Sequence, residues 1–245
     1  MRSLFSTILV LLIWVQPTTA QRLNPIVAKV GKRPALNYLE NLSLGAKAGD
    51  PVDQDKPTIV ITHGWNPAPE LVRLTTPQAY AKRVVEKYGD RYNVMAWNWD
   101  SRYQGSRLAN DSNAQNSGRQ LGMELIRRGV VPSRTTLIGH SMGTIVIAAA
   151  ASHIKSLKSE NLAELCLIDA PSGKFQVVYH ELCSNGCANR VRNFWVGGVT
   201  GIGAPMELPG IENIRAPIRK GRHRVAGNCL FNHVDILVWF HDYYL

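Results

Sequence analysis

The feature that most restricts how this chain can fold is a serine held between two glycines, in the sequence Gly-His-Ser-Met-Gly at residues 139–143. The segment before it, 135–138, has the apolar and β-branched composition of a buried strand. The segment after it, 145–151, is apolar, small and free of Gly and Pro, as in a buried helix. A serine in a sharp strand-to-helix turn has a strained backbone and an exposed hydroxyl, and flanking glycines let the two elements approach closely. We therefore expect Ser141 to be a nucleophile; the alternative is a Gly-Ser turn that only joins two elements.

The N-terminal residues 1–20 predict a secretory signal peptide. Arg2 supplies a positive charge, Leu4–Val15 form an apolar run, and Thr18–Ala20 give small residues before a cleavage point. The run is short for a membrane span, although an uncleaved anchor is the alternative. We expect a secreted protein whose mature chain, 21–245, is a single domain, because it contains no repeat, low-complexity tract or long linker.

The chain is basic, with 28 Lys and Arg against 18 Asp and Glu and a net charge of +10. Such an excess suits an anionic lipid, polysaccharide or nucleic-acid surface and does not choose among them. The sequence has no zinc-like Cys/His spacing, nucleotide-binding glycine loop or RNA-binding aromatic pattern. We therefore expect no metal, no cofactor and no nucleic-acid partner.

Four cysteines predict two disulfides in an oxidising compartment, with three possible connectivities. They are Cys166, Cys183, Cys187 and Cys229. Cys166 lies in an apolar run, so a buried free thiol is the alternative there.

Strands and helices are predicted to alternate along the rest of the chain. Strands are expected at 58–62, 93–99, 135–138, 162–168 and 190–196, and helices at 78–88, 114–128, 145–151 and 234–243. Short strands and a turn are expected within 24–44, and loops at 50–57, 100–112 and 201–227. This alternation predicts an α/β fold, a mostly parallel sheet with helices on both faces, in which reactive groups collect at the carboxyl ends of the strands.

A serine nucleophile needs a base, usually a histidine, and the chain has 7 histidines. His233 lies in a predicted loop just before the last helix, from which its ring could reach Ser141. His63 and His140 follow strands beside the site, and their rings are expected to be structural. The others remain alternatives: His153, His180, His223 and His241.

The carboxylate that orients the base is expected to be Asp169, which directly follows a predicted strand. Its alternative role is that of a turn-forming residue. The competing position is the end of the next strand, where the first acid is Glu207, while Asp235 is expected to cap the final helix. The resulting chain order, Ser141, Asp169, His233, is that of α/β-hydrolases.

Two backbone N–H groups are needed to stabilise the oxyanion of a tetrahedral intermediate. Met142, the residue after the nucleophile, is expected to supply one. The second should come from the loop after an earlier strand, where Gly64 lets the backbone turn close to the substrate. Trp65 is therefore the expected second donor, and its indole would line the acyl site; an ordinary buried aromatic is the alternative.

The sequence resembles the pancreatic-type lipase family at consecutive landmarks. The matching segments are I-T-H-G-W-N, W-N-W-D-S-R-Y-Q-G-S, R-Q-L-G, I-G-H-S-M-G, L-C-L-I-D-A-P-S-G and C-L-F-N-H-V-D-I-L. The resemblance covers Thr58 to Tyr244 and corresponds to the catalytic domain of that family. It implies an α/β-hydrolase fold and a secreted serine hydrolase, a lipase or phospholipase that acts on acyl-ester lipids through Ser141, Asp169 and His233.

This chain departs from the family pattern at two places. The acid block reads Asp-Ala-Pro instead of Asp-Pro-Ala. Cys229 stands four residues before His233 instead of two, so the lid disulfide of the family is not transferred. Two rival functions remain: a soluble esterase that acts on short-chain or cell-wall-linked esters, and a non-catalytic lipid-binding protein with a hydrolase fold.

The segment 199–228 occupies the position of the lid in that family. It combines apolar residues with prolines and then becomes basic, with Arg215, Arg219, Lys220, Arg222 and Arg224. The sharper hypothesis is a flap that covers the triad and whose basic end binds an anionic membrane or lipid surface. The alternative is a solvated basic loop.

Overall fold

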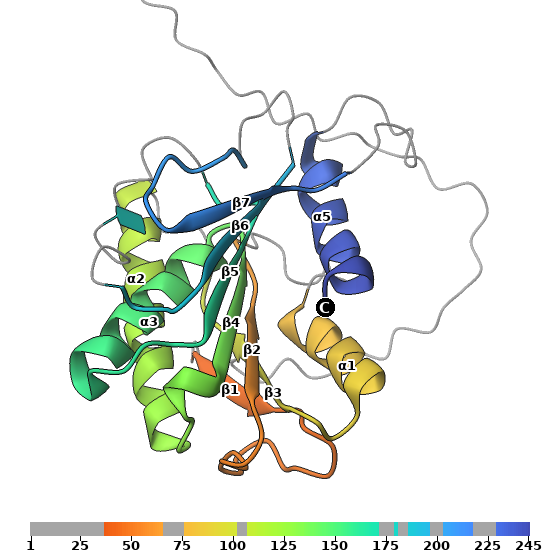
Figure 1. Ribbon diagram of the computed structural model, residues 1–245, viewed down its shortest axis with the longest axis vertical. Helices are drawn as coiled ribbons and strands as arrows, with labels where there is room; N and C mark the ends of the chain where they lie inside the picture. Colours follow the sequence, from red (N-terminus) through yellow and green to blue (C-terminus); the bar gives the residue numbers. More distant parts are fainter. Residues whose placement is uncertain are drawn as a thin grey trace, which may run out of the picture. The chain divides into compact units, whose positions relative to one another are not determined.

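A seven-stranded sheet lies at the centre of the structure, with the strand order β1-β3-β2-β4-β5-β6-β7 (Figure 1). The computed structural model describes residues 37–65, 76–101, 107–171, 179–180, 186–196, 203–217 and 229–245, with the backbone alone for 107–109, 229–232 and 234. The strands are β1 (Tyr38–Asn41), β2 (Thr58–Thr62), β3 (Asn93–Asn98), β4 (Thr135–His140), β5 (Glu164–Ile168), β6 (Val191–Trp195) and β7 (Ile211–Arg215). β1 is antiparallel to β3, and every other neighbouring pair is parallel.

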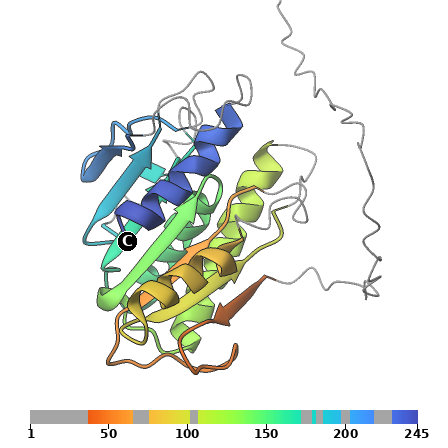
Figure 2. The same cartoon turned by 90° about the vertical axis from the view of Figure 1, so that its right-hand side faces the viewer.

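Helices cover both faces of this sheet. They are α1 (Pro77–Tyr88), α2 (Arg107–Arg127), α3 (Gly143–Lys158) and α5 (Cys229–Tyr243), and a short 3-10 turn, Pro132–Arg134, precedes β4. α2 and α3 pack on one face, and α1 and α5 lie on the other, as the two perpendicular views show (Figures 1 and 2). No helix in the described part of the chain has the length and apolarity of a membrane span.

The alternation of side chains along the strands builds one core on each face. In β2, Val60 faces α2 and α3, while Ile59 and Ile61 face α1 and α5. β4 does the same with Leu137 and Ile138. Each such side chain is at most 5% exposed, and its burial contributes about 1.5–3 kcal/mol. Parallel strands buried on both faces are the expected consequence of continuous apolar runs.

Helix α2 packs against α3 through small residues. A Cβ on Gly118 would lie 2.3 Å from the Val146 carbonyl oxygen, so only glycine permits this approach. α2 begins at residue 107, and the predictions of a loop over 100–112 and a helix start at 114 are therefore wrong. The buried face of α2 starts only at Ala114, and the first described side chains of the helix, at 110–113, are polar and partly or fully exposed, so the sequence carried no apolar signal there.

Strand β7 lies within the segment 201–227, which the sequence predicts as a loop. It pairs in parallel with β6 at the edge of the sheet. The strand has only five residues and two partly buried isoleucines, Ile211 and Ile214, and Gly210 and Pro209 precede it, so its pattern is that of a loop. Asn213 fixes it by accepting from the Met206 N–H at 2.8 Å.

The described part of the proposed flap is therefore core and sheet edge. Met206 is 2% exposed, and Leu208 and Ile211 pack against the same core. The flap prediction is wrong for 203–217, and the basic residues 218–224 lie outside the described residues, as do the predicted signal peptide and Cys183.

The predicted α/β fold is confirmed, and it is the α/β-hydrolase fold. One antiparallel edge strand is followed by parallel strands in the order given above, helices cover both faces, and the strand–serine–helix turn follows the central strand β4. This arrangement brings the carboxyl ends of β2, β4, β5 and β6 to one edge of the sheet.

Candidate active site

Ser141 occupies the turn between β4 and α3 in a left-handed backbone conformation, with φ 52°. This conformation is costly for a residue other than glycine and directs the side chain away from both elements. The Ser141 N–H donates to the Ile168 carbonyl at 2.9 Å, which ties the turn to β5. On the other side of the turn, the Thr144 N–H donates back to the Ser141 carbonyl at 3.0 Å.

The two glycines of the turn are required by close approach. A Cβ on Gly139 would lie 2.5 Å from the Gly143 carbonyl oxygen, and a Cβ on Gly143 would lie 2.4 Å from the His63 carbonyl oxygen. The loop after β2 thus touches the start of α3. Within that loop, a Cβ on Gly64 would be 2.6 Å from the Ser141 Cβ. The predicted role of these glycines in close packing agrees with this geometry.

Asp169 directly follows β5 and is 2% exposed. Its backbone is also left-handed, with φ 45°, a conformation that Asp tolerates better than most residues. The Asp169 N–H donates to the Phe194 carbonyl at 2.7 Å, and the Val196 N–H donates to Oδ1 at 3.3 Å. The carboxylate is therefore held by β6 as well as by its own strand.

His233 is brought to Asp169 across the carboxyl edge of the sheet. Its Nδ1 lies 2.5 Å from Asp169 Oδ2, and its side chain is 13% exposed. The ring therefore donates from Nδ1 to the carboxylate and has Nε2 left for a substrate or a nucleophile. Among the described residues, the Ser141 hydroxyl has no hydrogen bond to His233; such contacts often tighten only when substrate binds.

The prediction that His233 lies in a loop before the last helix is wrong, because α5 already begins at Cys229. No Gly or Pro occurs between Cys229 and His233, and the last glycine before the helix is Gly227. The helix therefore extends five residues further toward the N-terminus than its apolar pattern indicates. His233 is carried by a helix, which restricts its position more than a loop would.

The competing acid and bases lie elsewhere. Glu207 is exposed on the segment before β7. His153 and His180 belong to α3 and to a separate short segment, and His223 lies outside the described residues. His241 is buried on α5, where its ring stacks on Tyr80 at a centroid distance of 4.2 Å.

Three histidines, which we call the neutral histidines, are held neutral by their surroundings: His63, His140 and His241. Burial lowers the pKa of His63 to about 4 and that of His241 to about 3. Burial, followed by the neighbouring His233, lowers the pKa of His140 well below its ordinary value. The Nε2 atom of His63 also accepts from the backbone N–H of Trp99 at 3.4 Å, and the two rings stack on each other. A structural role for His63 agrees with these contacts.

The two expected oxyanion donors flank the turn. Met142 caps the N-terminus of α3, and Trp65 follows Gly64 at the end of β2 and is 49% exposed. Neither N–H donates to a backbone carbonyl of another described residue. The exposure of Trp65 excludes the alternative of an ordinary buried aromatic. The N-terminus of α3 adds a partial positive charge at the same point.

Gly203 is a site residue that the sequence did not indicate. A Cβ on it would lie 1.7 Å from Asp169 Oδ1, and an isolated antiparallel bridge joins it to Pro171. No local pattern reveals this contact, because Gly203 lies in a segment that reaches Asp169 only in the folded sheet.

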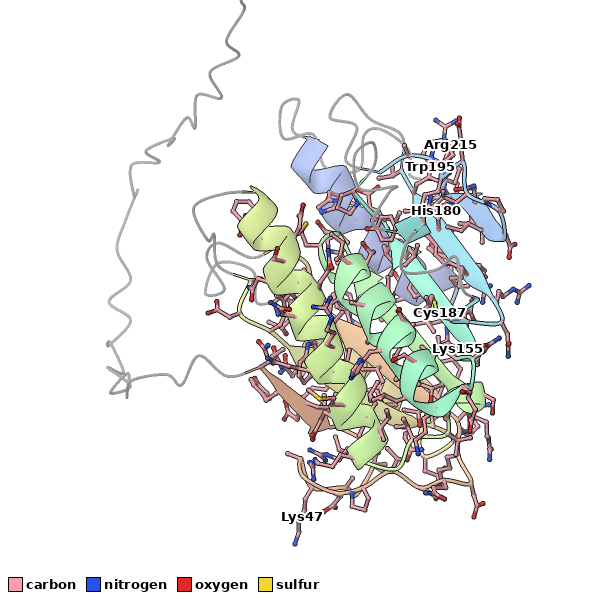
Figure 3. The ribbon with its side chains drawn as sticks, turned by 90° about the vertical axis from the view of Figure 1, so that its left-hand side faces the viewer. Lys47, Lys155, His180, Cys187, Trp195 and Arg215 are labelled. Atoms are coloured by element: carbon pink, nitrogen blue, oxygen red, sulfur yellow. The ribbon has the colours of Figure 1, made fainter. Side chains whose placement is uncertain are left out.

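In Figure 3, Trp195 and Arg215 mark the carboxyl ends of β6 and β7 near this edge of the sheet, and Lys47 marks the opposite end.

Two of the cysteines, Cys166 and Cys187, are buried in the described part of the chain. Cys166 is 2% exposed in β5, and burial, followed by Glu164, raises its pKa well above the ordinary value. Its Sγ donates to Glu164 Oε1 at 3.5 Å, which agrees with the free-thiol alternative. The side chains of Cys183 and Cys229 lie outside those described, so the disulfides remain a prediction. In the described residues, no group of three His, Cys, Asp or Glu side chains is arranged to hold a metal ion.

Comparison with known proteins gives only distant likenesses. No protein-family model matches the sequence. No curated protein is detectably similar to it.

Solved structures with a similar fold include the following three. Esterase 2 of Thermogutta terrifontis, phosphorylated by paraoxon, is 14% identical over 82% of this chain and 85% of that chain, with a TM-score of 0.45. A variant of LAE6, an alpha/beta hydrolase enzyme from the metagenome of Lake Arreo in Spain, is 12% identical over 76% of this chain and 74% of that chain, with a TM-score of 0.39. Cfl2 of Burkholderia cenocepacia is 20% identical over 49% of this chain and has a TM-score of 0.33; this chain spans only 35% of its length. The identities and scores are low, so the fold assignment rests on the strand order and the serine turn of this chain itself.

Proposed function

We propose that this protein is a serine hydrolase that cleaves carboxylic esters. The observation that carries the proposal is the pair of Asp169 and His233, 2.5 Å apart, at the same edge of the sheet as the strained Ser141 turn. The ring of His233 also lies against His140, the residue before Ser141, with centroids 4.2 Å apart. A nucleophile, a base and an acid are thus supplied by three different elements in the order Ser, Asp, His.

The proposed reaction has two steps. Ser141 Oγ attacks the ester carbonyl while Nε2 of His233 takes its proton, and the N–H groups of Trp65 and Met142 stabilise the oxyanion. His233 then returns the proton to the leaving alcohol, which leaves an acyl-enzyme. Water, activated by the same His233, hydrolyses this intermediate. Asp169 keeps the proton on Nδ1, so that Nε2 is free to act as the base.

The test is hydrolysis of a soluble short-chain ester by the full chain and by two variants. Ser141→Ala is expected to remove activity, and Asp169→Asn is expected to lower kcat about 10,000-fold with little loss of stability. Glu207→Gln is the matched control, because Glu207 is an exposed acid of the competing position. A near-normal rate for Asp169→Asn together with an inactive Glu207→Gln would assign the acid to the later position.

We further propose a lipase or phospholipase related to the pancreatic-type family, secreted after loss of 1–20, with an acyl-ester lipid as substrate. The motifs of the sequence and its net charge of +10 support this finer assignment. A panel of esters of increasing chain length, assayed below and above their solubility, tests it. A lipase gains activity once the substrate forms an interface.

The alternative is a soluble esterase without interfacial activation, and one observation favours it. Among the described residues of the expected flap, Met206 is a core residue that is 2% exposed, and Leu208 and Ile211 are partly buried against the same core. A rate that follows only dissolved substrate would select this alternative.

Contact with an anionic lipid surface is proposed through the basic residues Arg219, Lys220 and Arg222. Each positive charge near such a surface contributes about 1 kcal/mol, and salt screens the attraction. Binding to anionic vesicles should fall with added salt, and replacing the three residues with Gln should weaken it while leaving hydrolysis of a soluble ester unchanged. Equal binding to neutral and anionic vesicles at every salt concentration would contradict the proposal.

A further inference from the structure

His140 connects the serine turn to the backbone of His233. It is the last residue of β4, and its Nε2 lies 2.8 Å from the His233 carbonyl oxygen. A carbonyl oxygen only accepts, so Nε2 of His140 carries a proton and donates it. The two rings are also in contact, with centroids 4.2 Å apart and planes inclined by 39°. The contact joins residues that are 93 positions apart in the sequence.

The position of the His233 ring depends on such a connection. Asp169 holds the ring through Nδ1, and this hydrogen bond acts on the side chain alone. The hydrogen bond from His140 holds the main chain of the same residue, from the neighbouring strand β4. Two anchors on one residue, one on the ring and one on the backbone, restrict both its rotation and its distance from the serine turn.

The charge state of His140 suits a residue that holds the backbone of His233. It is 9% exposed, and the groups that face it are His233 and His63. Burial and these two neighbours lower the pKa of His140 well below its ordinary value, so the ring stays neutral. A neutral ring still donates from Nε2, and it adds no positive charge beside His233 when that residue takes up a proton during turnover.

We propose that His140 is a positioning residue, whose hydrogen bond to the His233 carbonyl fixes the imidazole of His233 between Asp169 and Ser141. The consequence for turnover rests on the proposed ester hydrolase function, in which His233 is the base. The hydrogen bond is the operative contact, and the ring stacking is secondary. The effect should therefore fall on kcat and leave KM nearly unchanged, because a mispositioned base slows the chemical steps without altering the contacts that bind substrate.

Two substitutions separate the hydrogen bond from the ring. His140→Phe keeps a ring and removes the donor, whereas His140→Gln keeps an N–H at a similar reach and removes the ring. His241→Phe is the matched control, because it makes the same replacement at a buried histidine of α5 whose Nε2 has no hydrogen-bond partner among the described residues. All three are compared with the wild type as full chains after urea unfolding has shown that they are folded.

The first measurement is kcat and KM for a soluble ester. We expect His140→Phe to lose about tenfold in kcat, the equivalent of one lost hydrogen bond to a positioned group, with KM within about twofold. His140→Gln is expected to retain most of kcat, and His241→Phe all of it. An unchanged kcat in His140→Phe, or an equal loss in His140→Gln, would overturn the proposal.

The second measurement does not require turnover. The proton between Asp169 and His233 lies in a 2.5 Å contact and should give a resonance far downfield in the proton NMR spectrum at acidic pH. We expect this resonance to persist in His140→Gln and His241→Phe and to broaden or vanish in His140→Phe. Its persistence in His140→Phe would overturn the positioning role. If the wild type failed to hydrolyse any ester, the proposed function would fail, and this measurement would still decide whether His140 positions His233.

Discussion

Gly203 leaves no room for a side chain beside Asp169, and Gly203→Ala should therefore disable the proposed acid. The added Cβ would lie 1.7 Å from Asp169 Oδ1 and 2.6 Å from Cγ. Because the centres of two non-bonded heavy atoms lie about 3.5 Å apart at normal contact, the carboxylate must move by roughly 1.8 Å. The bridge between Gly203 and Pro171 restricts how far the backbone can yield instead. This displacement is a large fraction of the 2.5 Å distance between Asp169 Oδ2 and His233 Nδ1, so this hydrogen bond should break.

The expected loss in kcat lies between about 100-fold, the cost of a misplacement near 1 Å, and about 10,000-fold, the cost of an acid that cannot fix the tautomer. Overpacking should also lower the free energy of unfolding by about 1–3 kcal/mol. Hydrolysis of a soluble ester and urea unfolding measure the two effects. Gly49→Ala is the matched control, since a Cβ at Gly49 would meet no atom within 4 Å. A Gly203→Ala variant with the kcat of Gly49→Ala would refute the reasoning.

Three further predictions concern buried contacts. Gly64→Ala would place a Cβ 2.6 Å from the side chain of the proposed nucleophile, and its kcat for the soluble ester should fall at least about 100-fold; an unchanged kcat would contradict this packing. Arg128→Met removes a 7% exposed guanidinium that pairs with a carboxylate and three backbone carbonyls, so the free energy of unfolding in urea should fall by about 3 kcal/mol. Arg127→Met, at the exposed arginine that pairs with the same carboxylate, should change the free energy of unfolding by less than about 1 kcal/mol. Equal losses in the Arg127 and Arg128 variants would contradict this expected difference. The neutral histidines take up protons on unfolding, because their pKa values are lowered in the folded chain. The free energy of unfolding should therefore fall as the pH drops from about 6.5 to about 4, and His241→Phe should reduce this slope by about 1.4 kcal/mol per pH unit; an unchanged slope would refute it.

The elements that the sequence predicted well are those with strong local signals. β2 has the predicted bounds, 58–62, because a run of five buried residues follows a polar loop that ends at Pro57 and is itself followed by His63 and Gly64. Helix α1 ends where predicted, since Gly89 caps it with φ 63°. The turn around Ser141 is also local, because strand, serine and helix are consecutive. These features need no distant partner to be recognised.

The features that the sequence did not predict depend on contacts between distant segments. β7 is stabilised by pairing with β6 and by the amide of Asn193, which donates to the Asn213 side chain at 2.9 Å. The clearance that Gly203 gives Asp169 exists only once the end of β5 and the segment before β7 are brought together. His140 was expected to have a structural ring, and its bond to His233 becomes visible only when α5 is placed over β4. Residue types and their positions along the chain indicated the candidate site residues, and the folded sheet determines which of them meet.

Covalent labelling tests whether Ser141 is the nucleophile that His233 activates. The full chain is treated with a fluorophosphonate, digested, and the modified peptide is identified by mass spectrometry. We expect one adduct, on Ser141, and a labelling rate that falls at least about 1,000-fold in His233→Ala. His241→Phe, at a buried histidine of the same helix, should label at the wild-type rate. An adduct on another residue, no adduct at all, or equal rates in the wild type and His233→Ala would contradict the proposed mechanism.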